Sequence, residues 1–364
     1  WYMVTAGAPW NPLKFDPNGV RETYAKMFLT LWNVYKFHAN YAALDGFNPE
    51  SGSESPVAER APLDQWLLSR LASVAQDYHD QFEGWDFHKA GRDLEDFVVN
   101  DVSNWYVRRS RRRLWDDAES ADKLACQHTL HEVLTTVCKL MAPIAPYMVD
   151  EIYTNLTGVS VHLADWPAGD AGDLPSRNTP LEERMALTRA LAEAGRRVRV
   201  EADRRQRLPC QAGWLVGGPD ISEFHDILAD ELNVESLTTE DDLERFQRIE
   251  VVPNWRALGA KCRADLPKVK EALGAADSEQ VWADIQAGSC TIEGFEITKE
   301  DVEVKRVEKD GFAAKTITFG EGDNAIDVTL VLDMATTPDL LSKGLARDII
   351  RRVQQKRKDL DLDV

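Results

Sequence analysis

The chain has 364 residues, of which 43% are hydrophobic and 29% are charged, and its formal net charge is -19 at pH 7. This composition excludes a disordered chain, and no apolar run reaches the roughly 18 residues that a membrane-spanning helix needs. The five cysteines form no CxxC pair, which argues against a zinc site and a disulfide framework and favours a cytoplasmic protein.

The acidic balance and the two ends of the chain support two further expectations. Acidic residues number 62 against 43 basic ones, which we interpret as a halophilic adaptation, because high salt screens surface charge. On that hypothesis, local charge indicates partners better than net charge does. The chain opens without methionine and closes inside a charged helical pattern, so we expect it to be a piece of a longer protein.

The first half of the sequence predicts an antiparallel helix bundle over residues 20–166. Residues 1–19 read as an irregular lead-in that contains several prolines. Apolar residues then recur at three- and four-residue steps, which predicts helices. These helices cover residues 20–44, 63–84, 86–115 and 125–158. We expect Asp64 to cap the second helix.

Prolines divide the last of these helices and mark the boundary that follows the bundle. Pro143 and Pro146 predict a break near Met141. Residues 167–180, which are rich in proline, glycine and aspartate, predict a linker between two domains.

The second half, residues 181–364, predicts a smaller α+β domain, so that the whole chain is mainly α. Alternation of apolar and polar residues between glycine turns predicts antiparallel strands. These antiparallel strands lie within residues 290–307 and 313–333, and two further short strands are predicted within residues 212–218 and 247–253. The predicted helices lie within residues 181–207, 220–232, 265–288 and 338–360.

One stretch, "DVSNWYVRRSRRRLWDD" at residues 101–117, concentrates arginine between aromatic residues. At 3.6 residues per turn, an apolar stripe that ends at Trp105 is continued by Arg109 and Arg112. Arg109 lies one turn beyond Trp105, where its guanidinium can cover the indole. Arginine binds phosphate through two parallel hydrogen bonds and stacks on flat rings, a combination typical of RNA-binding surfaces.

Two interpretations of this stretch stay open on the sequence alone. In the first, the arginines bind a polyanion. In the second, they pair with neighbouring Asp96, Asp101, Asp116 and Asp117 at a helix end, where cations are favoured in any case.

Two further basic clusters favour a long anionic partner. One is "GRRVRVEADRRQR" at residues 195–207, in which Arg196, Arg199 and Asp203 share a helix face, so that part of its charge is neutralised internally. The other is "RDIIRRVQQKRK" at residues 347–358.

No self-contained active site is evident in the sequence. No GxxxxGK[ST], GxGxxG, GxSxG or HExxH motif occurs. His128 and His131 lie three residues apart, but without a third ligand at suitable spacing we interpret them as ordinary helix residues and expect no metal site.

The residues quoted so far, together with several other segments, resemble the carboxy-terminal portion of the isoleucyl-tRNA synthetase family, a class I aminoacyl-tRNA synthetase. "GAPWNPLKFD" is similar to the segment after that family's KMSKS loop. The anticodon-binding helical domain is resembled by "FLTLWNVYKFHANYAALDGF", "LDQWLLSRL", "DVSNWYVRRSRRRLW", "LMAPIAPYMVDEIY" and "SVHLADWP". "ELNVE", "VVPNWRALGAKC" and "LARDIIRRVQQKRKDLDLDV" are similar to the C-terminal region of the archaeal and eukaryote-like branch.

This resemblance implies a tRNA-binding region of an enzyme that joins isoleucine to its tRNA with ATP. The HIGH and KMSKS signatures are missing, so ATP and magnesium are expected in a catalytic domain outside this chain, and the piece alone is not expected to be catalytic. The implied partners are isoleucine tRNA and that catalytic domain, with no membrane and a monomeric state. Two alternatives remain, namely the equivalent region of a valyl or leucyl enzyme and a helical module that docks proteins.

The candidate tRNA-binding residues come from the three basic clusters. They are Trp105, Arg108, Arg109, Arg111, Arg112, Arg113, Arg196, Arg197, Arg204, Arg205, Arg351, Arg352 and Lys356.

Overall fold

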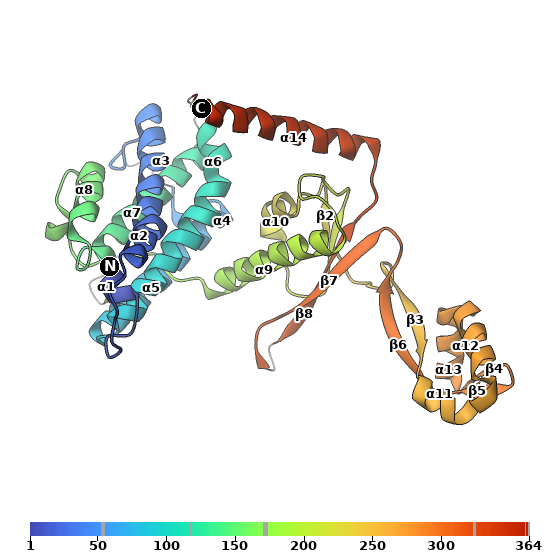
Figure 1. The fold of residues 1–364 in the computed structure, drawn as a ribbon. Helices are drawn as coiled ribbons and strands as arrows, with labels where there is room; N and C mark the ends of the chain where they lie inside the picture. Colours follow the sequence, from blue (N-terminus) through green and yellow to red (C-terminus); the bar gives the residue numbers. More distant parts are fainter. Residues whose placement is uncertain are drawn as a thin grey trace. The chain divides into compact units, whose positions relative to one another are not determined.

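A computed structural model describes the chain except for residues 52–54, 117, 119, 170–173, 323–324, 361 and 363–364. The contacts divide it into two units, Trp1–Ala186 and Leu187–Val364. A mainly helical first unit and an α+β second unit confirm the predicted fold class (Figure 1).

The first unit is built from helices that pack around α7. Its elements are α1 (Tyr2–Thr5), α2 (Pro17–Thr23), a π-helix (Tyr24–Phe28), α3 (Leu29–Asp45), a 3₁₀ turn (Val57–Glu59), α4 (Pro62–Glu83), α5 (Phe87–Asp96), a second π-helix (Phe97–Val107), α6 (Arg108–Trp115), α7 (Ala121–Met141), α8 (Pro146–Thr157), a 3₁₀ turn (Val161–Leu163) and the start of α9 (Thr179–Glu201). α7 contacts α3, α4, α6 and α8. Large apolar side chains such as Trp66, Leu71 and Phe97 are buried in this core.

The predicted break in the last bundle helix is confirmed. α7 ends at Met141, and α8 starts with Pro146 at its first position, where a missing N–H costs nothing. The predicted cap of α4 is wrong, because α4 starts at Pro62 after Ala61, and Asp64 lies buried inside the first turn. That carboxylate binds side chains from elsewhere in the bundle, as described below.

The boundary between the units lies within α9. The first turns of α9 pack on the first unit, where Ser69 Oγ donates to Glu182 Oε1 at 2.6 Å. The linker assigned to residues 167–180 stays a prediction, since residues 170–173 lie outside the described part of the chain.

The second unit contains a four-stranded sheet in the order β2-β1-β8-β7. Its strands are β1 (Gly213–Val216), β2 (Leu237–Glu240), β7 (Phe312–Phe319) and β8 (Ile326–Asp333). The antiparallel strands predicted within residues 313–333 are confirmed as the pair β7–β8, and β8 also pairs antiparallel with β1. Strand β2 was not predicted, and it pairs with β1 in parallel. The reason is that α10 (His225–Leu232) separates β1 from β2 as a crossover.

Close helix packing on this unit depends on Gly195 in α9. A Cβ at that position would lie 2.0 Å from Leu232 Cδ2 of α10, so any larger residue would force the Leu232 side chain to move.

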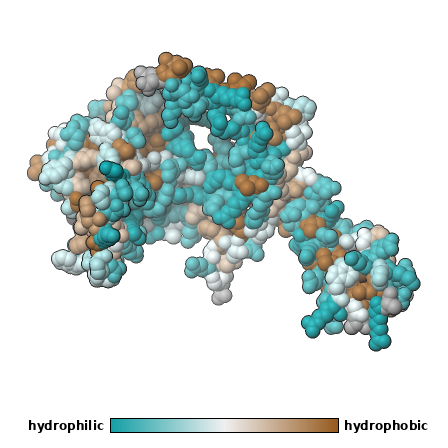
Figure 2. Space-filling view, in the orientation of Figure 1, coloured by the Kyte–Doolittle hydropathy of each residue, from teal (hydrophilic) through white to brown (hydrophobic). Residues whose placement is uncertain are grey.

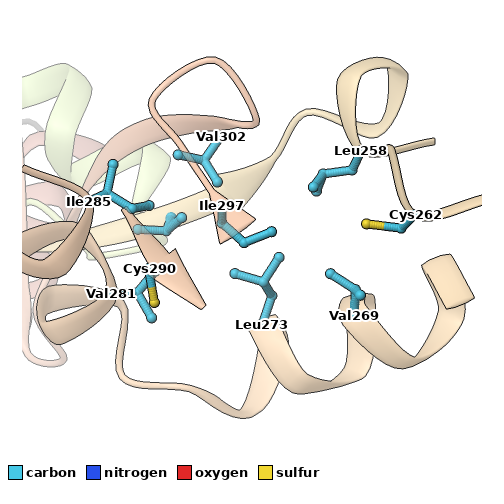
Figure 3. Close-up of a cluster of buried hydrophobic side chains, with 10 residues drawn as sticks. Leu258, Cys262, Val269, Leu273, Val281, Ile285, Cys290, Ile297 and Val302 are labelled. Carbon is cyan, nitrogen blue, oxygen red and sulfur yellow. The ribbon is translucent and has the colours of Figure 1, made fainter. Parts of the chain in front are cut away.

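Residues 247–308 form a lobe with a core of its own. Its elements are β3 (Gln247–Pro253), α11 (Trp255–Cys262), a 3₁₀ turn (Arg263–Asp265), α12 (Leu266–Ala275), α13 (Ser278–Ala287), β4 (Cys290–Ile292), β5 (Phe295–Ile297) and β6 (Val302–Glu308). β3 pairs with β6 antiparallel, from Gln247 opposite Glu308 to Pro253 opposite Val302. Figure 3 shows side chains from each helix, among them Leu258, Leu273 and Ile285, gathered in one cluster with Ile297 and Val302 from the strands. The chain then ends in α14 (Pro338–Asp359).

Candidate nucleic-acid interface

The arginine stretch forms the end of one long helical run. α5, the π-helix Phe97–Val107 and α6 follow one another without a break. In a π-helix each backbone N–H bonds five residues back, so more residues fit in each turn than in an α-helix. The face that α6 presents is therefore set by this wider segment.

The inner face of α6 holds Arg113 in a buried network with Asp64 and Tyr106. Arg113 Nη1 and Nη2 donate to the two Asp64 oxygens at 2.8 and 2.7 Å, and Tyr106 Oη donates to Asp64 Oδ1 at 2.5 Å. Arg113 Nε also donates to Asp122 Oδ2 at 2.7 Å. The Asp64 side chain is 0% exposed, so this charge is compensated entirely within the fold.

The pKa values of this network follow from its burial. Burial by itself would lower the pKa of Arg113. The hydrogen bonds from Arg113 to Asp64 raise this pKa by a larger amount, so the pKa lies above its ordinary value. Burial and the Asp64 charge together raise the pKa of Tyr106 well above its ordinary value. Arg113 therefore stays charged and Tyr106 stays neutral, and the guanidinium that was predicted to bind phosphate is held by Asp64 and Asp122 within the fold.

Trp105 also belongs to the core. Its side chain is 6% exposed, and the Arg109 guanidinium lies 4.5 Å from its ring centroid, which confirms the predicted cation–π contact. An indole covered in this way has no free face for a base. Arg112, which was predicted to continue the same stripe, is exposed, whereas Arg109 is half-buried.

The outer face of α6 carries the remaining cations of the stretch. Arg108, Arg111 and Arg112 are exposed, and Trp115 at the end of the helix is 56% exposed. Sequence reasoning did not include Trp115 among the site residues. The signal was its seven-residue spacing from Arg108, which places both on one helix face.

The aspartates proposed to neutralise the stretch include two with partners outside it. Asp101 accepts from Arg70 at 3.2 Å, and Asp96 accepts from Asn100. Asp116 lies just past the end of α6, and Asp117 lies outside the described residues. The arginines therefore differ in their surroundings: Arg113 is bound by Asp64 and Asp122, whereas Arg108, Arg111 and Arg112 are exposed, with Arg108 Nε donating to the Asn104 carbonyl at 3.1 Å.

In the second basic cluster, most arginines bind the fold of the second unit. Arg196 pairs with Glu231 at 3.1 Å, and Arg197 pairs with Glu193 one turn earlier. Arg204 donates to the carbonyls of Pro209 and Met334, whereas Arg205 is exposed.

Arg199 is buried rather than neutralised by Asp203 as expected. Its guanidinium donates to the carbonyl oxygens of Leu232 and Asn233, at 2.6 to 3.0 Å, and to that of Leu208 at 2.8 Å. These carbonyls include the end of α10, which has no intrahelical partners of its own. Arg199 therefore caps α10.

In the third cluster, on α14, Arg351, Arg352 and Lys356 are exposed. Apolar residues at four-residue steps are exposed beside them: Leu341, Leu345, Ile349 and Val353. In Figure 2 brown patches follow α14 among teal ones. This helix is thus both cationic and apolar on its surface.

The histidines considered for a metal pack as a ring cluster. His128 lies 4.8 Å from Phe47, and His131 lies 6.1 Å from His38, measured between ring centroids. Burial and the charges of His131 and His128 lower the pKa of His38 to about 3. Over the described residues, no group of three histidine, cysteine or acidic side chains is placed to hold a metal ion.

No helix in the described part of the chain has the length and apolarity needed to cross a bilayer.

Comparison with known proteins finds a matching family model and sequences that are similar over the whole length of this chain. Residues 64–213 match the family model described as the anticodon-binding domain of tRNA ligase. The whole chain is 34% identical to isoleucine–tRNA ligase of Cytophaga hutchinsonii and 35% identical to that of Porphyromonas gingivalis. It is also 35% identical to isoleucine–tRNA ligase 2 of Bacillus cereus. The chain spans about a third of the length of these relatives, namely 33%, 32% and 35%.

Proposed function

This chain belongs to the isoleucine–tRNA ligase family through its anticodon-binding region, and we propose that it binds the anticodon stem and loop of isoleucine tRNA. The observation that carries the proposal is the position of α6. This helix lies inside the matched segment 64–213, and its outer face presents exposed arginines that suit RNA phosphates.

The whole protein, on this proposal, joins isoleucine to its tRNA with ATP in the cytoplasm and acts as a monomer. We assign ATP, magnesium and the catalytic domain to the two thirds of the relatives' length that this chain does not span. The chain's own part is to hold the tRNA so that its acceptor end reaches that domain. The relatives reported above are all isoleucine enzymes, which favours isoleucine over the valyl and leucyl alternatives.

A salt series tests the proposal. Binding of the 364-residue chain to an isoleucine tRNA transcript is measured between low and moderate KCl, beside a noncognate tRNA and polyglutamate. We expect a straight, falling plot of log K against log[salt], with a slope of about 0.9 for each duplex phosphate neutralised. We also expect tighter binding to the cognate tRNA. A flat plot, or equal affinity for polyglutamate, contradicts the proposal.

A second candidate function, docking of protein partners, is favoured by α14. Its exposed Leu345 and Ile349 lie among arginines, a mixture found in protein interfaces. Leu341 and Leu345 also line a cavity of about 440 Å³ with Leu208 and Arg205. Capture of partners that survives nuclease treatment, and is lost when Leu345 and Ile349 are replaced by serine, would favour this function.

A further inference from the structure

α6 separates its residues into two faces with different surroundings. Ser110 and Leu114 are buried, and the inner arginines contact Trp105 and Asp64. On the outer face Arg108, Arg111, Arg112 and Trp115 are exposed. At 100° per residue, Arg108 and Trp115 lie nearly on one line, and Arg111 and Arg112 lie on either side of it.

Trp115 is the exposed aromatic of this outer face. Its side chain forms no hydrogen bond and no ring contact with any other described residue, and 56% of its surface is exposed. An indole buries a large apolar area when a flat partner covers it. The outer face of α6 therefore combines an exposed apolar ring with three exposed arginines.

The spacing of the outer face suits a short length of nucleic acid strand. Seven residues of α-helix rise about 10 Å. This equals roughly three nucleotides at the 3.4 Å spacing of a stacked strand. Arginines at intermediate positions can therefore contact phosphates of a strand while the indole meets one of its bases.

We propose that Trp115 stacks on an unpaired base of the bound RNA while Arg108, Arg111 and Arg112 contact phosphates of the same strand. In a duplex each base is covered by its neighbours, so only a loop or a single strand offers a free base face to an indole. The inference rests on the proposed function and deepens it, since it assigns α6 to the unpaired loop rather than to the stem. It also replaces Trp105, which the sequence favoured, with Trp115.

Two RNA probes and a set of tryptophan variants test this inference in the 364-residue chain. The first probe is the isoleucine anticodon stem-loop, and the second is the same strand annealed to its full complement. Trp115→Ala is expected to weaken stem-loop binding about 5- to 150-fold, the loss that follows removal of one stacked base. Its salt slope should stay that of the wild type, because no charge is removed. Duplex binding should not change.

Three control variants show whether a loss of affinity comes from base stacking by Trp115 or from the removal of any exposed side chain. Trp115→Phe keeps a flat ring and should retain most of the affinity. Trp10→Ala removes an indole that is 76% exposed in the same unit, and it should bind both probes as the wild type does. Arg111→Ala should weaken binding to the stem-loop and reduce the salt slope by about 0.7, the value for one contact on a single strand. Circular dichroism checks that each variant keeps its helical signal.

The possible results separate the stacking role of Trp115 from the proposed binding of tRNA by the chain. Salt-dependent binding by the wild type, with unchanged affinity in Trp115→Ala, overturns the stacking role and leaves tRNA binding intact. Such a result would assign the exposed indole to a protein contact instead. An equal loss in Trp115→Phe or Trp10→Ala also overturns it. Absence of salt-dependent RNA binding by the wild type overturns the proposed function itself.

Discussion

Arg113→Ala is expected to destabilise the helical unit, although Arg113 lies in the same basic stretch as the outer arginines. Its loss leaves the Asp64 carboxylate, which is 0% exposed, with Tyr106 as its remaining side-chain donor. Breaking a buried pair by removing one partner costs about 3–5 kcal/mol, because a buried charge is left uncompensated. Arg111→Ala on the exposed face of the same helix should change the free energy of unfolding by no more than about 0.5 kcal/mol.

Urea unfolding of the full chain, followed by far-ultraviolet circular dichroism at pH 7, measures both free energies. A second variant checks the cause. Replacing Asp64 with leucine and Arg113 with methionine removes both charges, and it should recover a substantial part of the lost stability. If Arg113→Ala unfolds like Arg111→Ala, the network contributes little and the structural assignment of Arg113 is refuted. An RNA-binding defect without loss of stability would refute it as well.

Two other predictions concern groups buried within each unit. Arg199→Met should lower the stability of the second unit by about 2–4 kcal/mol, because the carbonyls at the end of α10 lose a charged donor; urea unfolding beside Arg205→Met, at an exposed position, measures the difference. His38→Phe should reduce the loss of stability in acid. Burial lowers the pKa of His38 to about 3, so between about pH 6.5 and 3 the unfolded chain binds a proton that the folded chain does not, and stability falls with falling pH. The wild type should therefore lose up to about 1.4 kcal/mol per pH unit more than the variant in that range, and equal pH dependence of the two would contradict this cause.

The parts of the fold that the sequence predicts are those set by local periodicity. Apolar spacing predicted the long helices of both units, and Pro143 and Pro146 marked the break that follows Met141. The short helices α1 and α11 were not predicted, and α1 lies within the segment 1–19 that was read as irregular. The π-helix Phe97–Val107 was not predicted, because a change of hydrogen-bond partner from four to five residues leaves no distinct composition. The parallel pairing of β1 and β2 depends on a crossover, which local alternation does not reveal.

The candidate site depended on contacts that are distant in sequence. Asp64 read as a helix cap because its partner Arg113 lies 49 residues further along the chain. The sequence does not distinguish the five arginines of α6 from one another. In the structure they differ in burial, because Arg113 binds the buried Asp64 whereas Arg108, Arg111 and Arg112 are exposed. Trp105 and Trp115 likewise flank the same stretch, and only the packing of the bundle shows which indole is covered.

The π-helix Phe97–Val107 determines which residues of α6 face the core and which face solvent, because α6 continues directly from it. Removal of one residue from this segment, with its hydrogen-bond pattern kept, would turn everything after it by somewhat less than the roughly 100° that one residue spans in an α-helix. Such a turn would carry Arg113 away from its acid and bring the solvent-facing cations toward the apolar interior. The length of this segment is therefore as much a determinant of the basic surface as the arginines themselves, and a related chain with one residue fewer here would have to place its cations at different positions to present the same face.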